Sequence, residues 1–310
     1  MILVCGEALV DLFVGAEGHG TMALDGRAGG SPFNVAFGLA RLGRKVEFLA
    51  GLSNDLVGQR LHRFLVEEGV GARFLHRSDR LSTLSIVDLT SGTPAYAFYG
   101  EGAADRDLRE ENIPPLPDEI VALHLGSFST VVEPVGSTLE ALARRETARR
   151  FISYDPNIRP TIEPDMGVWR AKLAALAACA HLIKISDEDF ELLFPGLDPA
   201  EKAREWLAGT TCLVVLTRGG EGVRAWSRQH AVELVAPAIE LVDAVGAGDT
   251  FQAALLTALA ETGHLEARAL AAIGLPQLQV CLAFAAMAAA ITCSRRGADI
   301  PRRAELPPLP

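Results

Sequence analysis

The 310-residue chain has no excess of basic residues: 29 Lys and Arg stand against 39 Asp and Glu, which gives a formal net charge of −10 at pH 7. No long basic run interrupts this acidic balance. We therefore expect neither nucleic acid nor an anionic membrane surface as a partner. A small anionic ligand remains compatible with the composition, because backbone N–H groups at a helix terminus can outweigh a distant net charge.

Cysteines are few, and the chain has no long apolar run. The five thiols form no Cys-x-x-Cys pair and lie in or next to apolar stretches, at positions 5, 179, 212, 281 and 293. This is typical of buried thiols in a reducing compartment rather than of disulfides or a metal site. We expect no secretory leader, because the first apolar run has neither a basic n-region nor a small-residue cleavage site. The longest apolar stretch, about 280–291, is shorter than the roughly 20 residues that span a bilayer, so we expect a cytoplasmic protein.

Short apolar runs alternate with longer helical patterns along the chain, of which 49% is hydrophobic. Strands buried on both faces are expected at 2–5, 46–50, 121–125, 151–154, 182–185 and 213–216. Helices are expected near 32–42, 56–68, 135–149, 167–178, 199–207 and 251–260. The alternation predicts one α/β domain over residues 1–310, a layered sandwich with a mostly parallel sheet. Ligands then bind beyond the carboxyl ends of its strands.

One region breaks this alternation. Strand patterns at 85–89 and 95–99 are joined by a Thr-Ser-Gly-Thr-Pro turn at 90–94, and residues 9–14 form a further strand candidate. We expect residues 9–28 and 74–108, approximately, to form a small antiparallel lid over the sheet. An exposed sheet of this kind can pair with a second copy of the chain, so a homodimer through the lid is one open alternative.

The most informative segment is Asp243-Ala-Val-Gly-Ala-Gly-Asp-Thr-Phe251, a glycine-rich turn that runs into an apolar helix. The first turn of a helix offers unpaired N–H groups and the positive end of the helix dipole, and Gly246 and Gly248 let an anion approach the backbone. Asp249 at this junction repels phosphate. It is explained either as a helix cap or as the base that takes a proton from a hydroxyl attacking the phosphate.

A second glycine-rich turn, Gly29-Gly-Ser-Pro-Phe-Asn34, precedes another apolar helix. Ser31 is predicted to be the N-cap and Pro32 the first helical residue. Asn34 is polar on a turn filled by apolar residues. Its amide either caps the helix locally or holds a ligand hydroxyl as donor and acceptor.

Polar loops follow four further predicted strands. Asp11 follows the first strand and either ends a strand or binds a sugar diol. In Asp155-Pro-Asn-Ile-Arg-Pro160, Asn157 and Arg159 offer donors to anionic oxygens, with a solvated loop arginine as the alternative for Arg159. The acids of Lys184-Ile-Ser-Asp-Glu-Asp189 either stabilise a helix start or hold Mg²⁺ through water. Backbone of the flexible turn Thr217-Arg-Gly-Gly-Glu-Gly222 is suited to lie along a nucleotide.

Together these motifs resemble the ribokinase/PfkB carbohydrate kinase family over nearly the full chain. The stretch Gly29 to Gly43 is similar to the family's N-terminal motif, and Asp243 to Phe251 to its C-terminal motif. Within the family, the stretches 154–160, 184–189, 98–105 and 290–298 resemble the fructokinase-like branch. The resemblance implies a ribokinase-like fold, the three-layer α/β/α sandwich with a β lid, and ATP-dependent phosphorylation of a sugar.

The resemblance also implies roles for individual residues. It makes Asp249 the base, with Gly246, Ala247 and Gly248 forming the anion hole for the γ-phosphoryl group. It assigns sugar binding to Asp11, Gly30, Asn34, Tyr99 and Arg159. It assigns the nucleotide and its phosphates to Asn157, Lys184, Ser186, Thr217, Gly219 and Gly222. It implies Mg²⁺ through water at Asp189, and K⁺ at Asp243, Val245, Thr292 and Gly297.

Two departures from the family pattern bear on these roles. The family's Asn-x-x-Glu motif reads Ser186-Asp-Glu-Asp189, and Ala286 replaces an Asn that fructokinase-like members often carry near the adenine. The favoured interpretation is a fructokinase that uses ATP and Mg²⁺. Kinases of 2-keto-3-deoxygluconate and of aminoimidazole riboside are alternatives from the same family, and a non-catalytic sugar or nucleotide sensor is one from another class. A nicotinamide-dependent dehydrogenase is disfavoured, because Cys5 to Val10 lacks Gly-x-Gly-x-x-Gly.

Overall fold

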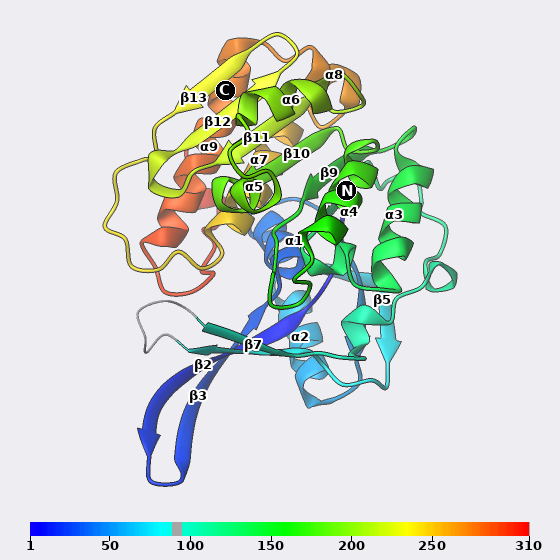
Figure 1. Ribbon diagram of the computed structural model, residues 1–310, viewed down its shortest axis with the longest axis vertical. Coiled ribbons are helices and arrows are strands. Elements are labelled where there is room, and N and C mark those ends of the chain that lie inside the picture. Colours follow the sequence, from blue (N-terminus) through cyan, green and yellow to red (C-terminus); the bar gives the residue numbers. More distant parts are fainter. Residues whose placement is uncertain (89–94, 310) are drawn as a thin grey trace.

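A nine-stranded sheet is the centre of the computed structural model, which describes residues 1–88 and 95–309 (Figure 1). In spatial order its strands are β13 (Ala231–Leu234), β12 (Val223–Ser227), β11 (Leu213–Thr217), β10 (Leu182–Ser186), β9 (Phe151–Asp155), β8 (Ala122–Gly126), β1 (Ile2–Cys5), β4 (Val46–Ser53) and β5 (Gly71–Ser78). Neighbours from β11 to β5 pair in parallel, and β12 and β13 add an antiparallel edge. The predicted mostly parallel sheet is confirmed.

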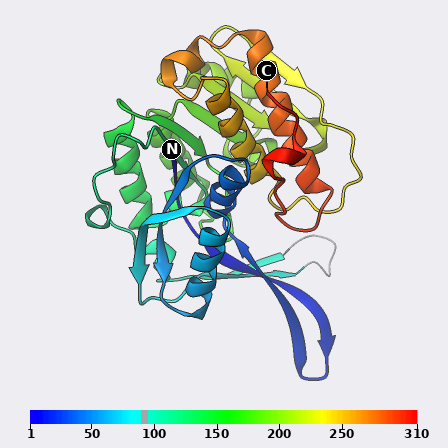
Figure 2. The ribbon, with the colours of Figure 1, turned by 180° about the vertical axis from the view of Figure 1, so that it is seen from behind.

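The strands are apolar on both sides because helices cover both faces of the sheet. In β1, Ile2 and Val4 belong to one core cluster, whereas Leu3 and Cys5 belong to the other. The first face carries α1 (Ser31–Arg41), α2 (Leu56–Glu67), α7 (Ala247–Glu261), α8 (Ala267–Ala271) and α9 (Leu275–Cys293). Most of these helices lie toward the viewer in Figure 2. The second face carries α3 (Val135–Glu146), α4 (Met166–Ala177), α5 (Asp187–Leu193) and α6 (Pro199–Leu207). The α/β/α sandwich is therefore confirmed.

Helix α9 is longer than the apolar run seen in the sequence. Its 19 residues make it, by length and composition, a helix that could cross a membrane. Leu278, Leu282 and Ala285, however, are completely buried in the same core cluster as α7. The apolar composition of α9 is therefore explained by its place in the core.

A smaller sheet projects from one end of the sandwich (Figure 1). Its order is β3 (Thr21–Gly29), β2 (Leu9–Gly18), β6 (Leu84–Asp88) and β7 (Ala95–Tyr99), with β2 and β6 parallel and the other pairs antiparallel. The predicted lid strands are present, but the sheet is mixed rather than antiparallel, because β2 and β6 run parallel. Residues 74–78, which we placed in the lid, are part of β5 in the large sheet. The turn predicted at 90–94 and the end of its preceding strand at residue 89 lie outside the described residues.

The polar loops meet where the parallel strands of the large sheet have their carboxyl ends. In the parallel register Gly126 is opposite Asp155, and Ser186 is opposite Thr217, each at the end of its strand. Residues that follow these strands therefore lie side by side although they are far apart in the sequence.

Candidate active site

Helix α7 begins at the glycine-rich turn. Gly246 is its N-cap, with φ of 76°, and a Cβ there would lie 2.5 Å from the Cβ of Ala298, so both the turn and the packing require glycine. Ala247, Gly248 and Asp249 form the first turn, where N–H groups and the helix dipole favour an anion. The N–H of Ala247 also donates to the carbonyl of Ala244 over 3.2 Å. A bound phosphoryl group would share that donor.

Asp249 is 7% exposed, and both of its carboxylate oxygens accept hydrogen bonds. Ser31 Oγ donates to Oδ1 over 2.6 Å and Asn34 Nδ2 donates to Oδ2 over 2.8 Å, while Asn157 Nδ2 lies 3.4 Å from Oδ1. Burial raises the pKa of Asp249, and the hydrogen bonds from Ser31 and Asn34 and the charge of Lys184 oppose that rise. The result is a buried carboxylate held in one orientation, as a general base requires.

The helix that carries Ser31 and Asn34 starts differently from the prediction. Gly30 is the N-cap of α1, Ser31 is the first helical residue and Pro32 the second, so the predicted Ser31 cap is wrong. Gly30 has φ of 104°, and a Cβ there would lie 2.9 Å from the carbonyl oxygen of Glu7. The Ser31 hydroxyl donates to Asp249 instead of capping, and Asn34 lies one turn further along the same face.

The predicted sugar-binding residues are only partly brought together. Asp11 on β2 is half-buried next to Gly29; burial raises its pKa, and the charges of Arg159 and Asp249 act on it in opposite directions. The Arg159 guanidinium donates to the carbonyl of Ile158 over 2.9 Å, so it is folded back on its own loop. Tyr99, on the edge strand β7, is 62% exposed. Of the predicted sugar-binding residues, Asn34 therefore contacts the base directly, Asp11 interacts with it through its charge, and Tyr99 lies in the small sheet.

Lys184 brings a buried positive charge to the start of α7. Its Nζ donates to Asp155 Oδ2 over 2.7 Å, and a Cβ on Gly248 would be 3.1 Å from the same nitrogen. Burial alone lowers the pKa of Lys184, but the carboxylates of Asp155, Asp249 and Asp189 outweigh it and hold the pKa above its ordinary value. The ammonium is therefore placed to face an anion at α7.

Asp189 and Ser186 belong to the start of α5. Ser186 is its N-cap, with the hydroxyl accepting the Asp189 N–H over 3.0 Å, so that hydroxyl already has a structural role. Burial, helped by Asp155, raises the pKa of Asp189 to about 6, against the opposing effects of Arg159 and Lys184. Among the described residues no group of three or more His, Cys, Asp or Glu side chains is placed to hold a metal. This donor set fits Mg²⁺ only in its usual mode, with few carboxylates and several waters or substrate oxygens.

The predicted nucleotide loop follows β11. Thr217 ends that strand, and Gly219, with φ of 48°, has open space where a Cβ would be. Gly222 has a packing reason of its own, since its Cβ would lie 2.0 Å from the carbonyl oxygen of Leu234. The loop therefore has free space beside Gly219, whereas Gly222 is packed against the backbone of Leu234.

The residues predicted to hold K⁺ come from two segments that Asp243 connects. Its Oδ1 accepts the Val245 N–H over 3.0 Å and its Oδ2 accepts the Gly297 N–H over 2.8 Å. The Thr292 hydroxyl is completely buried and pairs with Thr250 Oγ1 at 2.9 Å. A carboxylate and a hydroxyl are oxygen donors of the kind that a monovalent cation binds, although both Asp243 oxygens already accept backbone N–H groups. The segment leads directly into the turn of α7.

Three residues of this site had no predicted role in it. Asp155 was named only as part of its loop, although its position at the carboxyl end of β9 was a usable signal. Ser31 was interpreted as a cap, although its spacing of three from Asn34 places both side chains on one face. Glu7 is also buried there, 1% exposed, and burial raises its pKa to about 7.

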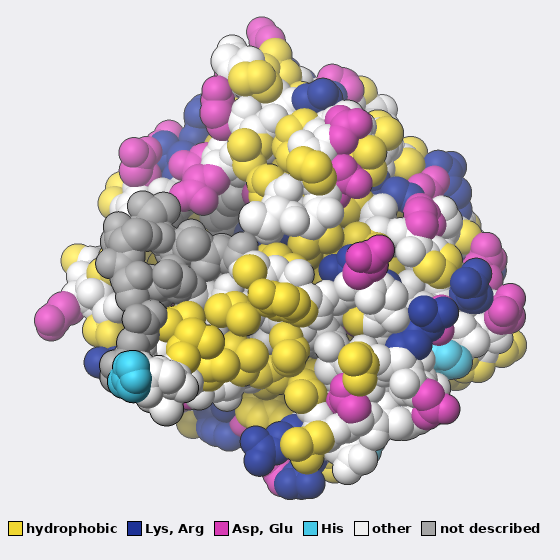
Figure 3. All heavy atoms as spheres, turned by 60° about the horizontal axis from the view of Figure 1, so that its bottom comes forward, with side chains coloured by type: hydrophobic (Ala, Val, Ile, Leu, Met, Phe, Trp, Pro, Cys, Tyr) yellow, Lys and Arg dark blue, Asp and Glu magenta, His cyan; other side chains and the backbone are white. Residues whose placement is uncertain are grey.

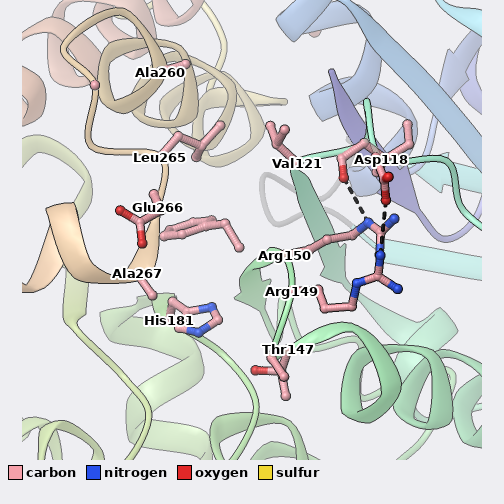
Figure 4. Close-up of a pocket in the computed structure, with 14 residues that line it drawn as sticks. Asp118, Val121, Thr147, Arg149, Arg150, His181, Ala260, Leu265, Glu266 and Ala267 are labelled. Carbon is pink, nitrogen blue, oxygen red and sulfur yellow. Dashed lines mark hydrogen bonds and ion pairs between the residues drawn. The ribbon is translucent and has the colours of Figure 1, made fainter.

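A hollow of about 670 Å³ lies at the other end of the strands, next to their amino ends (Figure 4). Its polar side chains have partners: Arg149 bonds Asp118, Arg150 Nε donates to the carbonyl of Ile120, and His181 Nδ1 accepts the N–H of Ile152. It is lined by residues next to the amino ends of strands, whereas α/β proteins of this class bind ligands at the carboxyl ends. The cluster around Asp249 is therefore the candidate active site.

Comparisons with known proteins agree with this geometry. The family model described as pfkB family carbohydrate kinase matches residues 1–305. The chain is 38% identical over 273 residues to a fructokinase of Rhizobium leguminosarum bv. trifolii, which covers 88% of this chain and 84% of the relative. It is 34% identical over 295 residues to a fructokinase of Klebsiella pneumoniae, which covers 93% of each chain. The crystal structure of a Xylella fastidiosa fructokinase with bound ATP superposes with a TM-score of 0.91 at 27% identity, over 98% of this chain and 96% of that one.

Proposed function

The chain belongs to the pfkB family of carbohydrate kinases, and on that premise we propose that it transfers the γ-phosphoryl group of ATP to a primary hydroxyl of D-fructose. The observation that carries this proposal is the buried carboxylate of Asp249 on the first turn of α7, where a base and an anion cradle coincide. Fructose is favoured because the relatives named fructokinase match this chain over most of both lengths. 2-Keto-3-deoxygluconate and aminoimidazole riboside are the alternative acceptors.

In the proposed reaction, Asp249 takes the proton of the acceptor hydroxyl as its oxygen attacks the γ-phosphorus. The bond to the β,γ-bridging oxygen breaks on the opposite side, and ADP leaves. Positioned base catalysis of this kind contributes about 10²–10⁴ in rate. The N–H groups at Gly246 to Gly248, the dipole of α7 and the Lys184 ammonium stabilise the charge that develops on the transferred group.

The acceptor lies, in this proposal, between the base and the small sheet. Asp11 accepts hydrogen bonds from sugar hydroxyls, Gly30 leaves room for them, and the amide of Asn34 holds the hydroxyl next to Asp249. Support comes from Asn34 Oδ1, which is buried without a hydrogen-bond partner among the described residues. Arg159 and Tyr99 contact the sugar once the small sheet closes and excludes water, which otherwise competes as the acceptor.

The nucleotide lies beyond the ends of β10 and β11. Its phosphates face Asn157, Lys184 and Ser186, and the remainder follows Thr217 and Gly219, with Gly222 shaping the turn. When bound, Mg²⁺ neutralises phosphate charge, and Asp189 is the residue that would hold it through water. K⁺ would lie at Asp243 with Val245, Thr292 and Gly297 and would stiffen the loop before α7.

We also propose that the enzyme works in the cytoplasm as a homodimer joined through the small sheet. Apolar side chains gather on the face of the molecule that Figure 3 shows. In the small sheet, Met22 and Leu24 of β3 and Tyr99 of β7 are exposed. An exposed sheet with apolar side chains is suited to pairing with a second copy. Sedimentation of the wild type and of the double variant Met22→Lys/Leu24→Lys tests the dimer. A wild-type dimer that becomes monomeric in the variant supports the proposal, and a monomeric wild type contradicts it.

Coupled ADP release with ATP, Mg²⁺ and K⁺ tests the acceptor. The panel contains fructose, 2-keto-3-deoxygluconate, ribose, aminoimidazole riboside and adenosine, each at several concentrations so that kcat/KM is compared. The highest kcat/KM on fructose is expected. A higher kcat/KM on another member of the panel would identify that compound as the acceptor in place of fructose. Absence of turnover on every acceptor while ATP binds would contradict the kinase reaction itself.

A further inference from the structure

Three side chains from separate elements form a directed chain of hydrogen bonds at the base. Asn157, in the loop after β9, donates through Nδ2 to Ser31 Oγ over 2.8 Å. Ser31, at the start of α1, donates to Asp249 Oδ1 over 2.6 Å. The residues are 126 and 218 positions apart in the sequence, so only the fold brings them together.

The order of donors fixes where the serine proton points. A hydroxyl has one proton to donate and lone pairs that accept. The amide of Asn157 occupies a lone pair of Ser31, which leaves the Ser31 proton directed at the carboxylate. A hydrogen bond to an ionised acceptor is shorter and stronger than a neutral one, which agrees with the 2.6 Å distance.

The backbone conformation of Asn157 favours this arrangement of hydrogen bonds. Its φ is 41°, one of two positive values among the described residues other than glycine. Asn tolerates this left-handed conformation better than most residues, and here it follows Pro156 at the end of a buried strand. The turn thus directs the amide back toward Ser31.

We propose that Ser31, oriented by Asn157, is a positioning residue that holds the carboxylate of Asp249 ionised and in a single orientation until the acceptor hydroxyl binds. This inference rests on the proposed kinase reaction, in which Asp249 is the base. It assigns a role in catalysis to a side chain whose sequence context predicted only a helix cap.

The pH dependence of the reaction follows from this role. The groups that act on Asp249 are Ser31 and Asn34 from α1, Lys184 from β10, Asp155 from β9 and Asp11 from β2; after burial, Ser31 has the largest effect and lowers the pKa of Asp249. Ser31→Ala removes that stabilisation of the ionised form. The acid limb of kcat/KM is then expected to move up by about one pH unit, the size of a hydrogen bond to a charged group.

The experiment compares four variants with the wild type over the pH range of activity. Ser31→Ala raises the acid limb, Ser31→Thr restores the hydroxyl and returns it toward the wild-type value, and Asn157→Gly keeps the positive φ while removing the donor to Ser31, so it raises the limb by less. Thr257→Ala is the control, because this buried hydroxyl donates to Ala253 within the same helix as the base. It leaves the limb unchanged.

A second readout needs no turnover. The carboxyl ¹³C resonance of Asp249, assigned by its loss in Asp249→Asn, titrates at higher pH in Ser31→Ala than in the wild type. An unchanged titration and an unchanged acid limb in Ser31→Ala would overturn the inference even if fructose is phosphorylated. A raised titration in an enzyme that does not phosphorylate fructose would instead keep the inference and reject the proposed acceptor.

Discussion

Removing the Lys184 ammonium leaves the Asp155 carboxylate buried without its partner. The two side chains are 4% and 2% exposed and their charged atoms lie 2.7 Å apart. Asp155 Oδ1 has no hydrogen-bond partner among the described residues, so no second donor compensates for the loss. Deleting one member of a buried ion pair costs about 3–5 kcal/mol, so Lys184→Met is expected to lower the free energy of unfolding by about that amount.

Urea denaturation of four proteins measures this effect as a double-mutant cycle. Asp155→Asn alone is also destabilising, because it leaves the ammonium with a weaker partner. The combination Lys184→Met/Asp155→Asn removes both charges, so its loss is smaller than the sum of the two single losses. The matched control is Lys202→Met, which breaks an ion pair of the same 2.7 Å length to Glu205; that carboxylate is 66% exposed, so the change stays within about 1 kcal/mol.

Two results would refute this reasoning. Losses below about 1 kcal/mol in both single variants would mean that the pair behaves as an exposed one. Additive losses in the double variant would mean that the two charges do not interact. Either result would also remove the support for an ammonium held next to Gly248.

Three further predictions concern buried or constrained groups. Burial raises the Glu7 pKa from 4.5 to about 7, so the folded chain holds a proton that the unfolded chain releases, and the free energy of unfolding falls as pH rises through this window. Between pH 5 and pH 8, Glu7→Gln should therefore lose less stability than the wild type, by roughly 2–3 kcal/mol. Asp243→Ala removes the acceptor of the Val245 and Gly297 N–H groups and should lower kcat at saturating K⁺, with an unchanged kcat contradicting the proposed stiffening role. Gly248→Ala places a Cβ 3.1 Å from Lys184 Nζ and should raise the KM for ATP, whereas an unaltered KM would mean that the phosphate does not approach this turn.

The sequence predicted elements best where burial is complete on both sides. Continuous apolar runs identified β1, β8, β9, β10 and β11, and the alternation with helices gave the layered fold. Strands at the sheet edges were harder, since one side is exposed and polar residues interrupt the pattern. Residues 74–78 of β5 were therefore assigned to the lid, and β12 and β13 were not predicted.

The site was predictable in its motifs but not in its internal contacts. The motif around Asp249 and the motif around Asn34 were expected to act together, and the hydrogen bond between them confirms that they meet. Ser31 was misassigned because local capping preference was outweighed by a carboxylate 218 residues away. The Lys184–Asp155 pair depends on the pairing of neighbouring strands, which apolar periodicity does not specify at the level of single side chains.

The measurement that tests the central claim most directly is the rate of γ-phosphoryl transfer from ATP to fructose in the wild type and in Asp249→Asn, with ATP binding measured by calorimetry in both. The substitution keeps the size of the side chain and removes the base. A fall in kcat of about 10²-fold or more with ATP binding retained is the predicted result, since a general base contributes that much. A variant that transfers phosphate at nearly the wild-type rate would contradict the assignment of Asp249 and with it the account of the site.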